Sequence, residues 1–193
     1  AGSRQIVHES VKVELMAKVA ARAEEIVQGD PTEADTEMGP VANRPQYEKV
    51  IGYLDGAREE GWTIAAGGGA NEELGGLFVR PTVVVAAPEA TIAREEVFGP
   101  VLTAYTFTDE EEAVRLANDT PYGLAGAVWT KDVHRAHRVA SAIKAGTVWI
   151  NAYRRNAIQV PVGGYKNSGL GRESGAEMIK EYLQVKSVWV SLA

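Results

Sequence analysis

A regular alternation of apolar and amphipathic segments between Val101 and Ile150 is the feature that most constrains the fold. The apolar segments have the length of strands, and the amphipathic segments repeat at helical spacing. Strand–helix–strand units of this length imply parallel strands joined by right-handed crossovers. The predicted fold class is therefore α/β. The predicted elements are a strand over 101–107, a helix over 108–118 opened by a capping box at residues 108–111, a strand over 125–130, a helix over 133–143 and a strand over 146–150.

The rest of the chain predicts further elements of both kinds. Gln5 to Val7 indicates the end of a strand, and Pro81 inside a predicted strand indicates a sheet edge or a bulge. Gly67-Gly68-Gly69 is more typical of a hairpin turn than of a phosphate-binding loop, because no lysine–serine pair follows it. The predicted elements are a helix over 10–28, a helix carrying Tyr47 to Ala57 and ending near Gly61, strands over 62–66 and 78–85, and a helix over 176–183.

The end of the chain predicts one more strand, over residues 185–190. A terminal strand needs a sheet edge, which either its own domain or a partner's sheet can supply. The expected organisation is one α/β domain over 1–183 followed by a strand segment over 184–193.

Composition narrows the class of protein. A chain of 193 residues with 45% hydrophobic residues can bury a core, and its net charge of -6 gives no basic surface for nucleic acid. No apolar run approaches the roughly 20 residues of a membrane span, and no signal peptide is recognisable. The chain contains no cysteine, which excludes disulfides, thiolate metal sites and a cysteine nucleophile within these residues. A cytoplasmic location is expected.

Two segments carry candidate functional residues. The turn Arg94-Glu95-Glu96-Val97-Phe98-Gly99-Pro100 precedes a strand, and on composition alone its acids are read as solvated and Phe98 as core. A long polar and glycine-containing loop, residues 151–173, follows the strand 146–150, where ligands bind in α/β sheets. His134 and His137 lie one helical turn apart beside two arginines, which favours a solvated basic face over a metal site.

Four segments in this order and spacing resemble the C-terminal portion of the NAD(P)-dependent aldehyde dehydrogenases. The resemblance covers essentially the whole chain, including its last predicted strand. The segments are REEVFGPV, NDTPYGLAGAVWT, GTVWIN and PVGGYKNSGLGRESG.

This resemblance implies a mechanism and a set of site residues. A cysteine thiolate attacks the aldehyde, hydride passes to NAD or NADP, and water activated by a glutamate hydrolyses the thioester to the acid. The resemblance places Glu96 on the hydroxyls of the nicotinamide ribose and Phe98 beside that ribose. It therefore replaces the interpretation of Glu96 as a solvated acid and of Phe98 as a core residue.

The resemblance also places the loop 151–162 in the substrate tunnel, with Arg154, Asn156 and Val162 as lining residues. Many members carry aromatic residues at the positions of Asn156 and Val162. If Arg154 or Arg155 points inward, an anionic or polar aldehyde is favoured; if both point outward, their charges say nothing.

The resemblance further implies that the catalytic cysteine sits two positions before Ala1, and that the general base and the dinucleotide domain lie further upstream. This chain alone is therefore expected to be inactive. The alternative is a non-catalytic module that associates with full-length relatives. A related acyl-phosphate or semialdehyde reductase fits the segments less closely. In each case we expect homo-oligomers formed through the terminal strand.

Overall fold

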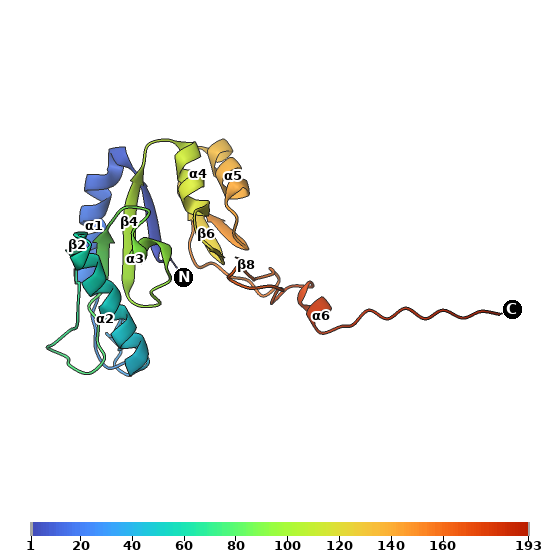
Figure 1. Ribbon diagram of the computed structural model, residues 1–193, viewed down its shortest axis with the longest axis horizontal. Coiled ribbons are helices and arrows are strands. Elements are labelled where there is room, and N and C mark those ends of the chain that lie inside the picture. The colour runs from blue at the N-terminus through green and yellow to red at the C-terminus, as the bar shows by residue number, and fades with distance from the viewer. Residues whose placement is uncertain (1, 193) are drawn as a thin grey trace. The chain divides into compact units, whose positions relative to one another are not determined.

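The computed structural model describes residues 2–192 and confirms a mixed α/β fold with parallel strands (Figure 1). The chain forms two compact units that divide between Leu116 and Ala117. The first unit contains a four-stranded sheet, and the second contains two small sheets of two strands each.

The sheet of the first unit has the strand order β1-β4-β3-β2. Strand β4 pairs in parallel with β1 on one side and with β3 on the other, and β2 closes the far edge antiparallel to β3. The strands are β1 (Arg4–His8), β2 (Thr63–Ala66), β3 (Thr82–Val85) and β4 (Val101–Phe107).

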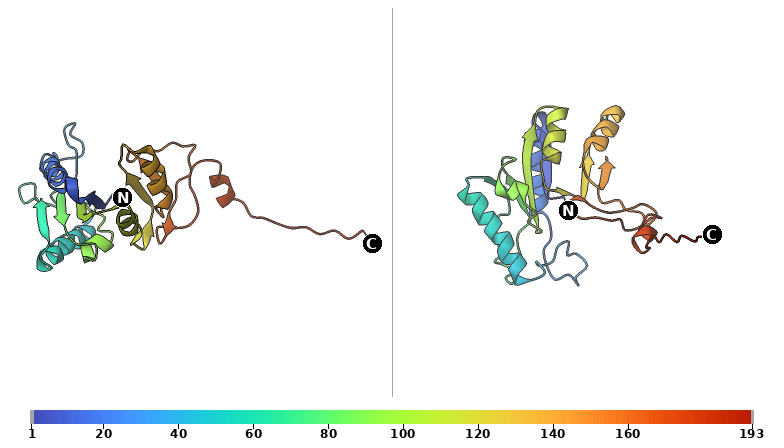
Figure 2. Two further views of the ribbon diagram at one scale, coloured as in Figure 1. Left: turned by 90° about the horizontal axis from the view of Figure 1, so that it is seen from above. Right: turned by 45° about the vertical axis from the view of Figure 1, so that its right-hand side comes forward.

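Helices cover both faces of this sheet (Figure 2, left). Neighbouring residues of a strand point to opposite faces, so Val83 joins the cluster under α1 while Val84 joins the cluster under α2. Leu54 of α2 and Val84 are fully buried. The helical elements are the short 3-10 turn η1 (Glu9–Val11), α1 (Lys12–Glu24), α2 (Arg44–Glu59) and the single-turn α3 (Thr91–Arg94).

The second unit confirms one of the predicted crossovers. Strands β6 and β7 pair in parallel, and α5 between them packs on both. Strand β4 does not join them, because both of its edges are occupied by β1 and β3. Helix α4 (Glu110–Asn118) crosses the boundary between the two units. The elements of the second unit are β5 (Tyr122–Gly123), β6 (Ala125–Val128), α5 (Val133–Ala142), β7 (Thr147–Ile150), β8 (Tyr165–Lys166) and α6 (Met178–Glu181).

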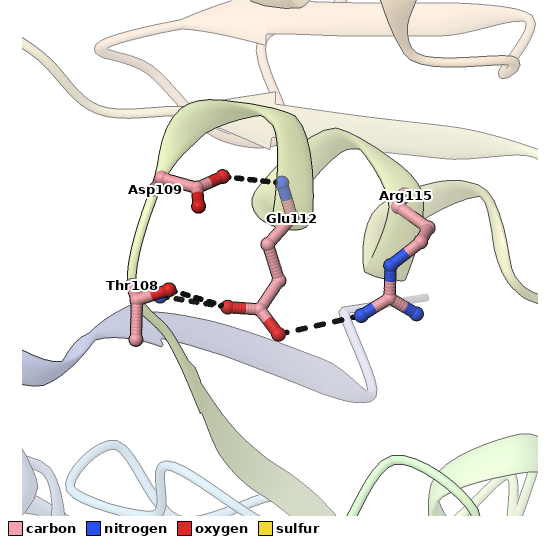
Figure 3. Close-up of polar contacts among 4 residues, drawn as sticks. All are labelled: Thr108, Asp109, Glu112 and Arg115. Atoms are coloured by element: carbon pink, nitrogen blue, oxygen red, sulfur yellow. Dashed lines mark hydrogen bonds and ion pairs between the residues drawn. The ribbon is translucent and has the colours of Figure 1, made fainter.

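The predicted capping box of α4 is displaced by one residue (Figure 3). Asp109 Oδ1 accepts the backbone N–H of Glu112 at 2.8 Å, and Glu112 Oε2 accepts the backbone N–H and hydroxyl of Thr108, both at 2.9 Å. These two bonds from Thr108 lower the pKa of the Glu112 carboxyl. Since Glu112, three residues after Asp109, closes the box, Glu111 takes no part in these bonds.

The predicted strand over 78–85 is shorter and more central than expected. Pro81 has no N–H to give to a ladder, and β3 begins after it, at Thr82. The expectation of an edge strand is wrong, because β3 lies between β4 and β2. A register shift does occur in the sheet, but it lies in β2, between Ile64 and Ala66, and not at Pro81.

The C-terminal elements differ most from the prediction. The helix expected over 176–183 is the single turn α6, and residues 184–192 are extended without strand pairing in the part of the chain described. A strand exists only against a hydrogen-bonded neighbour, and no edge within residues 2–192 receives this one. Val185 is 100% exposed and Trp189 is 94% exposed. Among the described residues no helix has both the length and the apolar character to span a membrane.

Candidate cofactor and substrate site

The turn before β4 presents Phe98 to solvent rather than to the core. Phe98 is 67% exposed, whereas its neighbour Val97 is 2% exposed and belongs to the main hydrophobic cluster. The Phe98 backbone is left-handed, with φ of 53°, a region that side-chain-bearing residues rarely adopt. The core reading of Phe98 is therefore wrong, because the chain reverses at this residue.

Side chains of helix α2 donate hydrogen bonds to the backbone carbonyls of this turn. Gln46 Nε2 donates to the carbonyl oxygens of Val97 at 2.7 Å and Phe98 at 3.0 Å, and Lys49 Nζ donates to the carbonyl oxygen of Glu96 at 3.1 Å. Gly99 lies so close to α2 that a Cβ there would come within 2.5 Å of Val50 Cγ2. The turn is thus pinned through its main chain, which leaves the side chains of Glu96 and Phe98 available.

The two adjacent carboxylates of the turn have different surroundings. Glu95 accepts a hydrogen bond from the Tyr53 hydroxyl. Glu96 is half-buried, and its carboxylate has no hydrogen bond or ion pair within residues 2–192. A carboxylate offers about four lone-pair positions, so Glu96 can accept the two protons of a vicinal diol. The available residues therefore fit a ribose, with Phe98 as an apolar neighbour.

The start of β1 lies at the same end of the sheet as this turn, because β1 and β4 are parallel and both begin there. In the parallel pair β1–β4, Arg4 is opposite Thr103, and the backbone N–H of Thr103 donates to the carbonyl of Ser3 at 2.9 Å. The turn 95–100 enters β4 only two residues before Thr103. The residues that lead into β1 and the turn therefore lie at the same end of the strand pair β1–β4.

In the second unit, the loop after β7 is anchored at its first residue. Asn151, with φ of 50°, exchanges two hydrogen bonds with Thr130, at 2.9 and 2.8 Å. Trp149 Nε1 donates to the carbonyl of Arg155 at 2.7 Å, and the ring of Tyr153 packs edge-on against Trp149 with centroids 5.4 Å apart. These contacts fix the path of residues 151–155.

The three sequence-predicted tunnel residues lie in or just after this loop. Arg154 has φ of 54°, and both Arg154 and Asn156 are exposed. Val162 is half-buried and forms an antiparallel bridge with Glu173, with reciprocal N–H to carbonyl bonds of 2.7 Å. Glu96 and Phe98 belong to the first unit, whereas the tunnel residues belong to the second.

Sequence reasoning missed two residues that organise these segments. Gln46 donates to the carbonyl of Val97 in the turn before β4 from 51 positions away, a separation at which local pattern carries no signal. Arg172 donates to the carbonyl oxygens of Gly164 at 3.0 Å and Gly171 at 2.6 Å, and it stacks over the Tyr165 ring at 5.3 Å. An arginine within a glycine-rich loop is the signal that could have identified it.

The family model described as the aldehyde dehydrogenase family matches residues 1–188. The chain belongs to this family. A betaine aldehyde dehydrogenase of Brucella anthropi is 44% identical over 195 aligned residues, which cover 99% of this chain and 40% of that protein. The chain thus spans about 40% of the length of the curated relatives it matches.

Solved aldehyde dehydrogenase structures match the fold closely. A betaine aldehyde dehydrogenase of Staphylococcus aureus, solved in complex with NAD+, is 47% identical with a TM-score of 0.91, over 94% of this chain and 37% of that one. An aldehyde dehydrogenase of Bacillus cereus has a TM-score of 0.95 at 42% identity, over 100% of this chain and 39% of that one.

Proposed function

We propose that this chain supplies one wall of the cofactor site and part of the substrate tunnel of an NAD(P)-dependent aldehyde dehydrogenase. The reaction converts an aldehyde, water and NAD(P)+ into a carboxylic acid, NAD(P)H and a proton, through a cysteine thioester. Family membership and the NAD+ complex of the Staphylococcus aureus relative support the proposal. The observation that carries it is the pinned turn, with an available Glu96 carboxylate beside an exposed Phe98.

Each residue of the turn has a distinct part. Glu96 accepts hydrogen bonds from the two hydroxyls of the nicotinamide ribose, and the Phe98 ring limits the positions that the nicotinamide can take. When bound, NAD(P)+ supplies the hydride acceptor. Gln46 and Lys49 hold the carbonyl groups of the turn, so the two side chains are oriented before the cofactor arrives.

The nucleophile is proposed to come from the residues that lead into β1. The chain has no cysteine, and the family pattern puts the catalytic cysteine two positions before Ala1. The pairing of Arg4 with Thr103 supports this proposal, because it places the start of β1 at the same end of the sheet as the proposed cofactor turn. The 193-residue chain by itself is accordingly proposed to be inactive.

The test uses the enzyme expressed from the complete reading frame that contains this sequence. Glu96→Gln should raise the dissociation constant for NAD+ about tenfold, the effect of weakening hydrogen bonds to a charged group. Glu95→Gln is the matched control, because Tyr53 already occupies that carboxylate, and it should change the constant much less. Equal effects of the two variants on NAD+ binding, measured by calorimetry, would remove Glu96 from the site.

We also propose that the extended C-terminal segment mediates homo-oligomerisation. The exposure of Val188, Val190 and Leu192 supports this, because apolar residues at every second position favour addition to another sheet. Deletion of residues 184–193 should convert oligomer to monomer in analytical ultracentrifugation. The alternative function, a non-catalytic module, would require the isolated chain to co-elute with a full-length relative, and separate elution would eliminate it.

A further inference from the structure

The substrate loop differs in charge from the rest of the chain. Residues 151–173 contain four basic residues and one acidic residue, although the whole chain has a net charge of -6. This local excess of positive charge attracts anions. The four residues are Arg154, Arg155, Lys166 and Arg172.

Two of these cations donate hydrogen bonds to backbone carbonyl oxygens. Lys166 Nζ donates to the carbonyl oxygens of Asn118 and Thr120, both at 2.9 Å, and Arg172 donates to carbonyl oxygens of its own loop. Arg154 and Arg155 are exposed, and neither guanidinium has a hydrogen bond or ion pair in the described part of the chain. These two side chains therefore remain available for a ligand.

The backbone distinguishes Arg154 from Arg155. Arg154 has a left-handed backbone with φ of 54°, and such conformations in residues other than glycine concentrate at ligand-binding segments. The Asn151–Thr130 bonds precede it, and the bond from Trp149 to the Arg155 carbonyl follows it. Arg154 thus projects from a short segment braced at both ends, so less freedom is lost when it binds a ligand.

We propose that Arg154 binds the carboxylate of a negatively charged aldehyde, so that the preferred substrates are semialdehydes. This inference rests on the proposed function. The planar guanidinium can bind a carboxylate through two parallel hydrogen bonds, which gives both affinity and orientation. Asn156, exposed two residues later, offers an amide donor in place of an apolar wall.

The same charge disfavours the substrate named for the similar relatives. Betaine aldehyde carries a quaternary ammonium, which a cation such as Arg154 repels. The one acidic residue of the loop is Glu173, whose backbone bridges Val162 and whose side chain is exposed. A single carboxylate does not offset the four cations, and the preference for anions is retained.

The experiment compares three aldehydes with the enzyme expressed from the complete reading frame. Succinic semialdehyde, butanal and betaine aldehyde differ chiefly in charge, and NADH formation gives kcat/KM for each. Succinic semialdehyde should exceed butanal by about 10- to 100-fold, the contribution of a charge-assisted hydrogen bond, and betaine aldehyde should be the poorest. A preference for butanal or betaine aldehyde would overturn the inference alone. Oxidation of none of many aldehydes tested would instead overturn the proposed function.

Variants assign the effect to Arg154. Arg154→Gln should reduce the ratio of kcat/KM for succinic semialdehyde to that for butanal by about tenfold or more, mainly through KM. Arg154→Lys keeps the positive charge but lacks the planar guanidinium, and the ratio should fall less in this variant than in Arg154→Gln. Arg155→Gln is the matched control and should retain the wild-type ratio. A loss of the ratio in Arg155→Gln but not in Arg154→Gln would contradict the assignment. Because the ratio is internal to each variant, partial misfolding does not imitate the expected result.

Discussion

Arg4 of β1 lies opposite Thr103 of β4 in a parallel strand pair, and the Thr103 N–H binds the Ser3 carbonyl. This relationship joins two segments that are about one hundred residues apart in the chain. Because the two strands are parallel, the residues that enter β1 lie at the same end of the sheet as the turn that carries Glu96 and Phe98. The proposed cofactor wall is therefore built at the amino end of β4, whereas the substrate loop follows the carboxyl end of β7.

The brace formed by Gln46 should be necessary for cofactor binding. Gln46→Ala leaves the carbonyls of Val97 and Phe98 without their side-chain donor, so we expect a loss of about 1 kcal/mol in the free energy of unfolding and weaker NAD+ binding. Thermal melting and calorimetry measure the two effects in the enzyme from the complete reading frame. Glu48→Ala, an exposed position on the same helix, is the control. Unchanged NAD+ affinity in Gln46→Ala would mean that the turn does not need this support.

Two glycine positions predict opposite changes in stability. A Cβ on Gly146 would lie 1.7 Å from the carbonyl oxygen of Gly163, so Gly146→Ala should lower the free energy of unfolding by about 2 kcal/mol or more. Gly52 lies inside α2 with no atom within 4 Å of its added Cβ, so Gly52→Ala should raise stability by up to about 1 kcal/mol. Urea unfolding measures both values, and a harmless Gly146→Ala would be inconsistent with the packing described.

The cap of α4 should weaken in acid. The Thr108 backbone N–H and hydroxyl lower the pKa of Glu112 in the folded chain, so its contribution to stability is present above the pKa of the unfolded chain. That contribution is lost as the pH falls through the lowered folded pKa. Glu112→Gln should reduce the acid sensitivity of thermal unfolding between pH 5 and roughly pH 3. Glu111→Gln is the control, and an identical pH profile for Glu112→Gln and the wild type would refute this role.

The predictable part of the fold is the part set by local periodicity. The β6–α5–β7 crossover follows from strand and helix spacing alone, and its parallel register is confirmed. The pairing of β1 with β4 was not predicted, because partner choice between distant strands depends on packing against α1 and α2. The observed cap of α4 lies one residue after the predicted one. Glu111 and Glu112 are both acids, and only side-chain geometry determines which of them makes the capping bonds.

The site residues were harder to predict from the neighbouring sequence than the fold was. Residue types around Glu96 and Phe98 favoured a solvated acid and a core aromatic, and only the family resemblance indicated a cofactor site. The structure adds the exposure of Phe98, which its left-handed backbone explains. The strand predicted over 185–190 is not formed, because a strand needs a hydrogen-bonded neighbour and no strand within residues 2–192 pairs with it.

NADH formation by two proteins assayed side by side tests the central claim most directly. One is the 193-residue chain, which has no cysteine, and the other is the enzyme expressed from the complete reading frame. With NAD+ and succinic semialdehyde, the complete enzyme should form NADH and the 193-residue chain should form none. NADH formation by the 193-residue chain alone, or none by the complete enzyme with any aldehyde, would contradict the assignment of this chain as the cofactor and substrate wall of an aldehyde dehydrogenase.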